Sequence, residues 1–321
     1  MDRRTDRATT LPHRRVASGF TLIELMIAIT IGLLIMATTS ALFVSSSNAR
    51  RQIELSADVI ENGRYGLETL SRQLSQAGFY GTLAVPTGTT LDPCAVDFAA
   101  WAGSLAIPAM GFNNAQADPA CLNRKPGTDA IFIQRASTCT IAESGVGCGE
   151  SSANVYLQVS ECGSEYSVKP FVVAKGRDPS FTLQTKACDG TLATKRRLIR
   201  RIYFITPSDV LSYVTISPSG VGTPVALVEN IEQMQIEYAV DSNDDGTPDS
   251  FTPTPADWSQ VIGVRVWLLA RSSEASANAG NALTLQMSDT TLTIPAAAAN
   301  FKRRVYSTYI PFMTPKSRRE S

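Results

Sequence analysis

The chain has 321 residues, of which 44% are apolar and 18% are charged, and its formal net charge is zero. This balance is typical of a membrane-anchored globular protein with one large or two modest domains, and it argues against a nucleic-acid-binding protein. The single histidine, His13, lies within the first 19 residues. The rest of the chain therefore cannot form a Ser-His-Asp or Cys-His site and lacks the commonest zinc ligand, so we do not expect an enzyme.

Residues 1–19 form a polar leader that carries five Arg and two Asp. The positive-inside rule predicts that this leader stays in the cytoplasm and that everything after Val44 lies outside it. Without the leader, 24 Lys and Arg stand against 27 Asp and Glu, a formal charge of −3. A mildly acidic mature chain again argues against nucleic acid as a partner.

Residues 20–44 form a long apolar run that contains one charged residue, Glu24. A helix of about 25 residues is roughly 37 Å long, which is enough to cross a hydrocarbon core of about 30 Å. We therefore predict that 20–44 is the transmembrane half of a longer helix. A charge at this depth costs on the order of 2.5–3.5 kcal/mol on insertion scales, so Glu24 requires a partner and a role.

Residues 19–24 read GFTLIE, which resembles the processing site of type IV prepilins. The resemblance implies that prepilin peptidase cleaves between Gly19 and Phe20, that the Phe20 amine is then methylated, and that the apolar segment is retained. It also implies that Glu24 pairs with the N-terminal amine of a neighbouring subunit and so directs subunit docking. The alternative, an ordinary signal peptide cleaved near Ala41, would leave Glu24 without a role.

The helix is predicted to continue to Ala77 and to end at Gly78, because apolar residues recur at spacings of three, four and seven. They are Ile53, Ala57, Ile60, Leu67, Leu70, Leu74 and Ala77. We expect residues 45–77 to form an amphipathic half that carries a globular domain on this stripe. Gly63 and Gly66 are expected to bend or weaken its middle.

Six cysteines lie in the segment 78–197, beyond the apolar run. They are Cys94, Cys121, Cys139, Cys148, Cys162 and Cys188. An even number outside the cytoplasm predicts three disulfides, whereas the lack of a CxxC pair argues against zinc. Six cysteines allow 15 pairings, and the sequential order is favoured because each pair then closes a loop of modest length. We predict that 78–197 is a loop-rich insertion stapled by these disulfides.

Runs rich in β-branched and aromatic residues predict strands in the second part of the chain. In the insertion they are 130–135, 154–160 and 171–175, and in the region 198–321 they are 198–206, 211–216, 232–240, 261–270 and 302–311. We predict an α+β, pilin-like fold in which the long N-terminal helix packs on an antiparallel β-sheet. The ending from Tyr309 to Phe312 leaves the edge pairing of the last strand open.

An acidic turn separates two of these strands. Residues 241–249 read DSNDDGTPD and place oxygen ligands at positions 1, 3, 5 and 9, with a glycine at position 6. The candidate ligands are Asp241, Asn243, Asp245, Thr247 and Asp249. This spacing resembles a calcium-binding loop, although Thr252 stands where the usual bidentate Glu would be. A solvated hairpin loop is the alternative, because Asp-rich turns are common.

Five basic residues, Lys195, Arg196, Arg197, Arg200 and Arg201, cluster around the start of one predicted strand. They indicate either a phosphate-binding patch or a strand edge whose solvated charges discourage edge pairing. The strand edge is the favoured interpretation. The acidic charge of the mature chain argues against a contact with DNA.

Residues 62–67 (NGRYGL), 76–81 (QAGFYG), 260–269 and 302–308 resemble segments of the PilW family of type IV pilus-assembly proteins. The resemblance implies a minor pilin that helps to initiate pilus assembly near the filament tip and supports twitching motility and adhesion. Its implied partners are prepilin peptidase, other minor pilins, the major pilin, a tip adhesin and the inner membrane. Its implied location is the bacterial inner membrane, with a periplasmic domain, and then the pilus at the cell surface. The alternatives are a type II secretion pseudopilin and a membrane-anchored module that binds a surface ligand.

Overall fold

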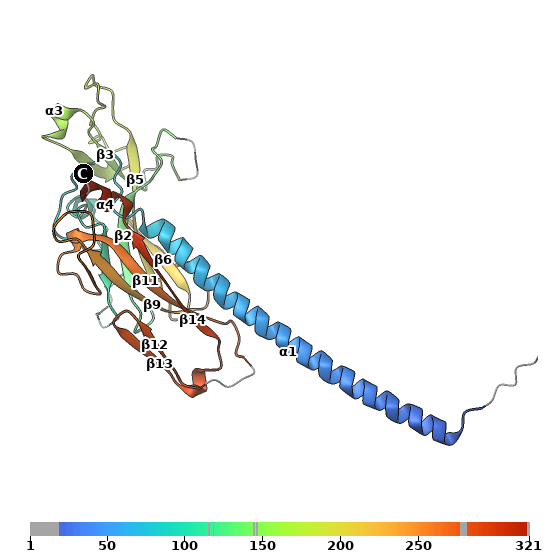
Figure 1. The fold of residues 1–321 in the computed structure, drawn as a ribbon. Coiled ribbons are helices and arrows are strands. Elements are labelled where there is room, and N and C mark those ends of the chain that lie inside the picture. Colours follow the sequence, from blue (N-terminus) through green and yellow to red (C-terminus); the bar gives the residue numbers. More distant parts are fainter. Residues whose placement is uncertain are drawn as a thin grey trace, which may run out of the picture. The chain divides into compact units, whose positions relative to one another are not determined.

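The chain divides into two compact units, Met1–Ile53 and Glu54–Ser321. A computed structural model describes residues 19–319, apart from 115, 118, 144, 146 and 277–280. One helix, α1 (Leu22–Leu74), contributes residues to both units. Figure 1 labels this helix and most of the strands that follow it.

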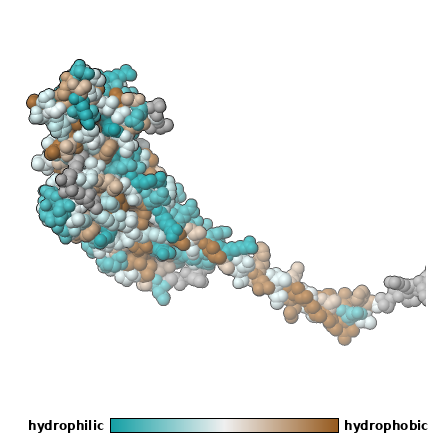
Figure 2. Space-filling model, turned by 45° about the horizontal axis from the view of Figure 1, so that its top comes forward, coloured by the Kyte–Doolittle hydropathy of each residue, from teal (hydrophilic) through white to brown (hydrophobic). Residues whose placement is uncertain are grey.

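The first unit consists of the N-terminal part of α1, whose large apolar side chains are exposed up to Ile53. Figure 2 shows many of these apolar residues in brown. In the part of the chain that the structure describes, α1 is the one helix long and apolar enough to cross a membrane. An apolar surface of this extent requires lipid or neighbouring helices to cover it.

In the second unit, α1 buries one face against the β-structure. The buried residues of α1 are Leu55, Val59, Gly63, Gly66, Leu70 and Leu74. The predicted stripe is therefore correct at Leu70 and Leu74 but wrong at Ile53 and Ile60, which are exposed. The buried face contains the two glycines as contact residues together with Leu55 and Val59, and this face leaves Ile53 and Ile60 exposed.

The two glycines do not interrupt α1, because both lie inside one continuous helix. A Cβ atom added to Gly63 would overlap the ring of Tyr306, and one added to Gly66 would lie 3.0 Å from Cδ1 of Leu268. The missing side chains thus let the helix backbone approach the strands that carry Tyr306 and Leu268.

The first sheet contains eight strands in antiparallel pairs. Its main path has the order β1-β2-β5-β3-β4, while β6 pairs with β5, and β7 and β8 pair with β6. The bounds are β1 (Ala109–Phe112), β2 (Ala130–Ala136), β3 (Val155–Val159), β4 (Phe171–Lys175), β5 (Lys195–Ile205), β6 (Leu211–Ser217), β7 (Gly220–Val221) and β8 (Val225–Val228). The segment 78–197 thus supplies strands to the main sheet as well as loops.

The second sheet has the order β10-β9-β11-β14 and is also antiparallel. A separate hairpin is formed by β12 and β13. The bounds are β9 (Ile231–Val240), β10 (Ser250–Thr252), β11 (Val261–Arg271), β12 (Leu283–Met287), β13 (Thr290–Ile294) and β14 (Arg303–Pro311). The open question about the last strand is answered, because β14 pairs with β11 from Arg303 through Pro311.

Short helices complete the fold. They are α2 (Phe98–Ala102), α3 (Gly163–Tyr166), α4 (Met313–Arg319), η1 (Trp258–Gln260) and η2 (Ala296–Ala298). Alternate residues of β5 face two different cores: Tyr203 packs in the core that contains Leu70 of α1, whereas Ile202 packs in the core that contains Trp101. The observed architecture confirms the predicted α+β, pilin-like fold.

Two further predictions can be compared with the structure. Three disulfides form in the sequential order, Cys94–Cys121, Cys139–Cys148 and Cys162–Cys188. The interpretation of the basic cluster as a strand edge is wrong, because β5 pairs with β2 on one side and with β3 and β6 on the other. Sequence alone could not place this strand in the interior of the sheet, since its partners come from distant segments.

Candidate functional site

The predicted processing segment lies directly before α1. Gly19 and Phe20 are exposed, and Phe20 keeps 83% of its surface accessible. Thr21 caps the helix: its Oγ1 accepts a hydrogen bond from the Glu24 N–H (3.3 Å), and its carbonyl oxygen accepts one from the Leu25 N–H (3.1 Å). Sequence reasoning singled out Glu24 but missed Thr21, although the T-x-x-E spacing is a known helix-start signal.

The Glu24 side chain is exposed in the first turn of α1. Within residues 19–319, as far as the structure describes them, no cation forms an ion pair with its carboxylate. A carboxylate is stabilised near a helix N-terminus by the helix dipole, but that effect is typically below about 1 kcal/mol. This is less than the cost of placing a charge in a membrane, so the helix end alone does not compensate for Glu24.

The acidic turn 241–249 connects β9 to β10 and is held by its own hydrogen bonds. Asp241 is buried, and its carboxylate accepts hydrogen bonds from the N–H groups of Gly246 (3.0 Å) and Asp245 (3.3 Å). At the other end, the Asp249 carboxylate accepts hydrogen bonds from the N–H (2.7 Å) and the hydroxyl (2.6 Å) of Ser242. Gly246, with φ of 82°, occupies a left-handed conformation that favours glycine.

The same turn lowers the pKa of two exposed carboxyl groups. Hydrogen bonds from Thr247 lower the pKa of Asp245, and hydrogen bonds from Ser242 lower the pKa of Asp249. Asn243 also donates a hydrogen bond to Asp245 (3.1 Å). In the described part of the chain, no three His, Cys, Asp or Glu residues are arranged to hold a metal ion. Calcium binding by this turn therefore stays a prediction.

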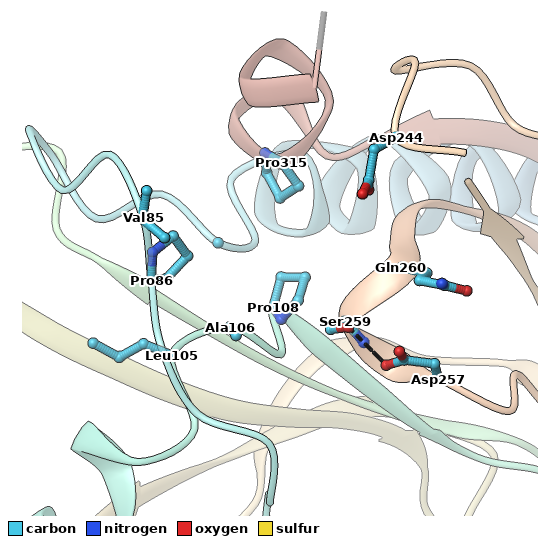
Figure 3. Close-up of a pocket in the computed structure, with 11 residues that line it drawn as sticks. Val85, Pro86, Leu105, Ala106, Pro108, Asp244, Asp257, Ser259, Gln260 and Pro315 are labelled. Atoms are coloured by element: carbon cyan, nitrogen blue, oxygen red, sulfur yellow. Dashed lines mark hydrogen bonds between the residues drawn. The ribbon is translucent and has the colours of Figure 1, made fainter. Parts of the chain in front are cut away.

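A cavity of about 520 Å³ lies beside the turn (Figure 3). One wall is apolar and contains Pro86, Pro108 and Pro315, while Asp244 and Asp257 contribute carboxylates on the other wall. The Asp257 carboxylate already accepts hydrogen bonds from the Ser259 N–H (2.8 Å) and hydroxyl (2.7 Å). Asp257 thereby caps the start of η1. The lining residues do not include a histidine, cysteine, lysine or arginine, so this cavity does not resemble a nucleophilic catalytic site.

A buried carboxylate, Asp129, joins the two sheets. It accepts hydrogen bonds from the N–H groups of Ile236 (2.7 Å) on β9 and Asn114 (2.8 Å), and its own N–H donates to the carbonyl of Met234 (2.9 Å). Burial raises the pKa of Asp129 to about 7, although the two N–H donors and Arg124 act in the opposite direction. This position was not singled out in the sequence, because nothing local marks Asp129 as buried.

Asp129 predicts a pH dependence of stability. Between the ordinary aspartate pKa of 3.8 and the folded-state pKa of about 7, the folded chain holds a proton on Asp129 that the unfolded chain has lost. Its contribution to the free energy of unfolding therefore falls as the pH rises through this window, by up to about 1.4 kcal/mol per pH unit. Denaturant unfolding of the wild-type chain and of Asp129→Asn should be measured from pH 4.5 to 7.5. The difference between their free energies of unfolding should change with pH. Parallel stability curves would contradict this prediction.

Comparisons with known proteins identify two regions of the chain. Residues 14–40 match the family model of the prokaryotic N-terminal methylation motif, and residues 189–313 match the one described as Type IV Pilus-assembly protein W, PilW. The first range contains Gly19, Phe20 and Glu24, and the second contains the whole second sheet with the acidic turn. Neither range includes residues 62–81. Comparisons with curated proteins and with solved structures found no match.

The apolar N-terminal helix, the methylation motif and the antiparallel sheets together define a prepilin-like protein anchored in the inner membrane. The likeness of residues 189–313 to PilW, together with the methylation motif, supports a PilW-like minor pilin related to type IV pili. The matched family is described as a pilus-assembly protein, which supports other pilins and the membrane as partners.

Proposed function

We propose that this minor pilin helps to initiate assembly of the type IV pilus as part of a priming or tip complex, and that it thereby supports twitching motility and adhesion. The observation that carries the proposal is the exposed apolar part of α1 with Glu24 in its first turn. Such a helix is suited to bundle with the helices of other pilins, because lipid and helix packing are the two ways to cover its surface.

Processing would prepare this helix for assembly. Prepilin peptidase would cleave between Gly19 and Phe20, and methylation of the Phe20 amine would leave a positive charge next to the membrane. The amine of one subunit and Glu24 of its neighbour then attract each other strongly, because the dielectric constant in the bilayer is low. An unpaired Glu24 is costly in lipid, so pairing favours the assembled state.

The proposed partners are prepilin peptidase, other minor pilins, the major pilin and a tip adhesin. The arginine-rich leader supports a topology in which the globular unit lies in the periplasm before it reaches the pilus at the cell surface. Disulfides in the globular unit are consistent with an oxidising compartment.

Intact-mass and N-terminal peptide analysis of the protein from the membranes of its own host tests the processing step. We expect a mature chain that begins at N-methylated Phe20. A chain that begins near Leu42 would contradict the proposal, because the apolar segment and Glu24 would have been removed.

A pseudopilin of a type II secretion system is the second candidate, since the N-terminal methylation motif is compatible with it. The match of residues 189–313 to PilW favours the pilus. Deletion of the gene should abolish twitching motility and leave protein secretion unchanged. Loss of protein secretion with normal twitching motility would instead assign the chain to a type II secretion system.

A further inference from the structure

Arg135 of β2 and two arginines of β5, Arg197 and Arg201, lie on one face of the first sheet. Arg135 of β2 lies directly opposite Ile199 of β5. Arg197 lies two positions before Ile199 and Arg201 two positions after it, so both side chains are on the same side of the sheet as Ile199 and Arg135. Cross-strand neighbours in this diagonal arrangement are within reach of long side chains. The charges of Arg197 and Arg201 are close enough to Arg135 to lower its pKa.

These arginines have few hydrogen-bond acceptors, although each guanidinium carries five N–H donors. Arg135 donates a hydrogen bond to the carbonyl of Ala136 (3.2 Å). Arg201 donates one to Oε1 of Gln73 (3.3 Å) and also interacts with the Tyr203 hydroxyl. In the described part of the chain, the side chain of Arg197 donates none. The Nε atoms of all three arginines are buried and lack a hydrogen-bond partner there.

The cluster also lacks a compensating negative charge. Among the described residues, no carboxylate forms an ion pair with any of the three arginines. Arg135 is 9% exposed, and burial followed by the charges of Arg201 and Arg197 lowers its pKa, while Tyr203 acts in the opposite direction. Arg201 gains a cation–π contact with Tyr213, at 4.3 Å from the ring centroid, but this leaves its charge uncompensated.

A small cavity lies next to this cluster. On one edge of β5, β3 pairs with residues up to Arg197 and β6 pairs with residues from Arg201 onward. Residues 198–200 of β5 therefore pair only with β2, on the other edge. The resulting gap contains a cavity of about 120 Å³, whose lining includes Arg197, Arg201 and Thr215 but not Arg135, which lies on the other side of β5. A cavity of this size suits a single small ion rather than an extended ligand.

We propose that Arg197 and Arg201, with Arg135 adding its positive charge from the neighbouring strand, form a binding site for a divalent tetrahedral oxyanion of the phosphate class. Arginine forks match the oxygen geometry of such an anion, and charge-assisted hydrogen bonds are the strong ones. A divalent anion compensates more of the three charges than a monocarboxylate does. The unpartnered N–H groups supply donors, and Thr215 offers a hydroxyl at the edge of the cavity. The proposal does not depend on the role in pilus assembly.

Thermal unfolding of the full-length chain in detergent, with inorganic phosphate as the probe at constant ionic strength, tests the site. We expect millimolar phosphate to raise the Tm of the wild-type protein by about 2–4 °C. The rise should disappear in Arg197→Gln and become smaller in Arg135→Gln. In phosphate-free buffer these two variants should be at least as stable as the wild type, because each removes an uncompensated charge.

Arg196→Gln is the matched control, because Arg196 lies on the same strand but on the opposite face, where it contacts the ring of Phe79. This variant should retain the phosphate-dependent rise in Tm. Acetate at the same ionic strength should leave the wild-type Tm unchanged. The proposal is overturned if phosphate does not raise the Tm, if the rise persists in Arg197→Gln, or if acetate raises it equally.

Discussion

Replacing Glu24 by Ala is expected to leave cleavage after Gly19 intact but to reduce incorporation of the protein into pili by about 100-fold or more. The reason is that removing one partner of a buried ion pair costs about 3–5 kcal/mol, and each 1.4 kcal/mol changes an equilibrium about tenfold. The measurement compares the amount of mature protein in the membrane with the amount in sheared filaments. Glu24→Gln should behave like Glu24→Ala if charge rather than size is responsible.

Glu54→Ala is the matched control, because Glu54 is also an exposed glutamate of α1 but lies beyond the apolar part of the helix. This variant should be cleaved and incorporated like the wild type. Normal amounts of the Glu24→Ala protein in filaments would show that Glu24 does not direct docking. Loss of cleavage in Glu24→Ala would instead place Glu24 in the recognition of the peptidase.

Gly63→Ala is expected to destabilise the globular unit even though alanine is the better helix former. The helix propensity alone would favour Ala by about 1 kcal/mol. A Cβ at this position would, however, overlap the ring of Tyr306 on β14, and overpacking of a well-packed contact typically costs about 1–3 kcal/mol. We therefore expect a net loss of stability, measured as a Tm that is several degrees lower for the full-length chain in detergent.

Gly163→Ala is the control for this prediction, because Gly163 also lies in a helix and a Cβ added there has no atom within 4 Å. It should be neutral or slightly stabilising. Tyr306→Ala should restore part of the loss when it is combined with Gly63→Ala, since it removes the overlapping ring. A Gly63→Ala protein as stable as the wild type would mean that Tyr306 moves aside at little cost.

Contacts between distant segments could not be predicted from local patterns. The spacing of apolar residues predicted a buried stripe on α1, but Ile60 is 37% exposed and Gly63 is buried. A helix buries the face that fits its partner most closely, and the partner strand β14 lies far along the chain from Gly63. In the same way, Arg135 joined Arg197 and Arg201 only through the pairing of β2 with β5.

The sequence by itself determined the features that depend on neighbouring residues. It predicted the apolar helix with Glu24, the processing motif and most of the strands, because each of these is specified by short-range spacing. The sequential disulfide order was favoured for its modest loops but was not determined, because six cysteines allow 15 pairings. Only the tertiary structure decided which face of α1 is buried, that β5 lies inside its sheet, that Asp129 is buried, and that Arg135 lies beside Arg197 and Arg201. These depend on strand order and burial, which are set by contacts between segments that no local pattern links.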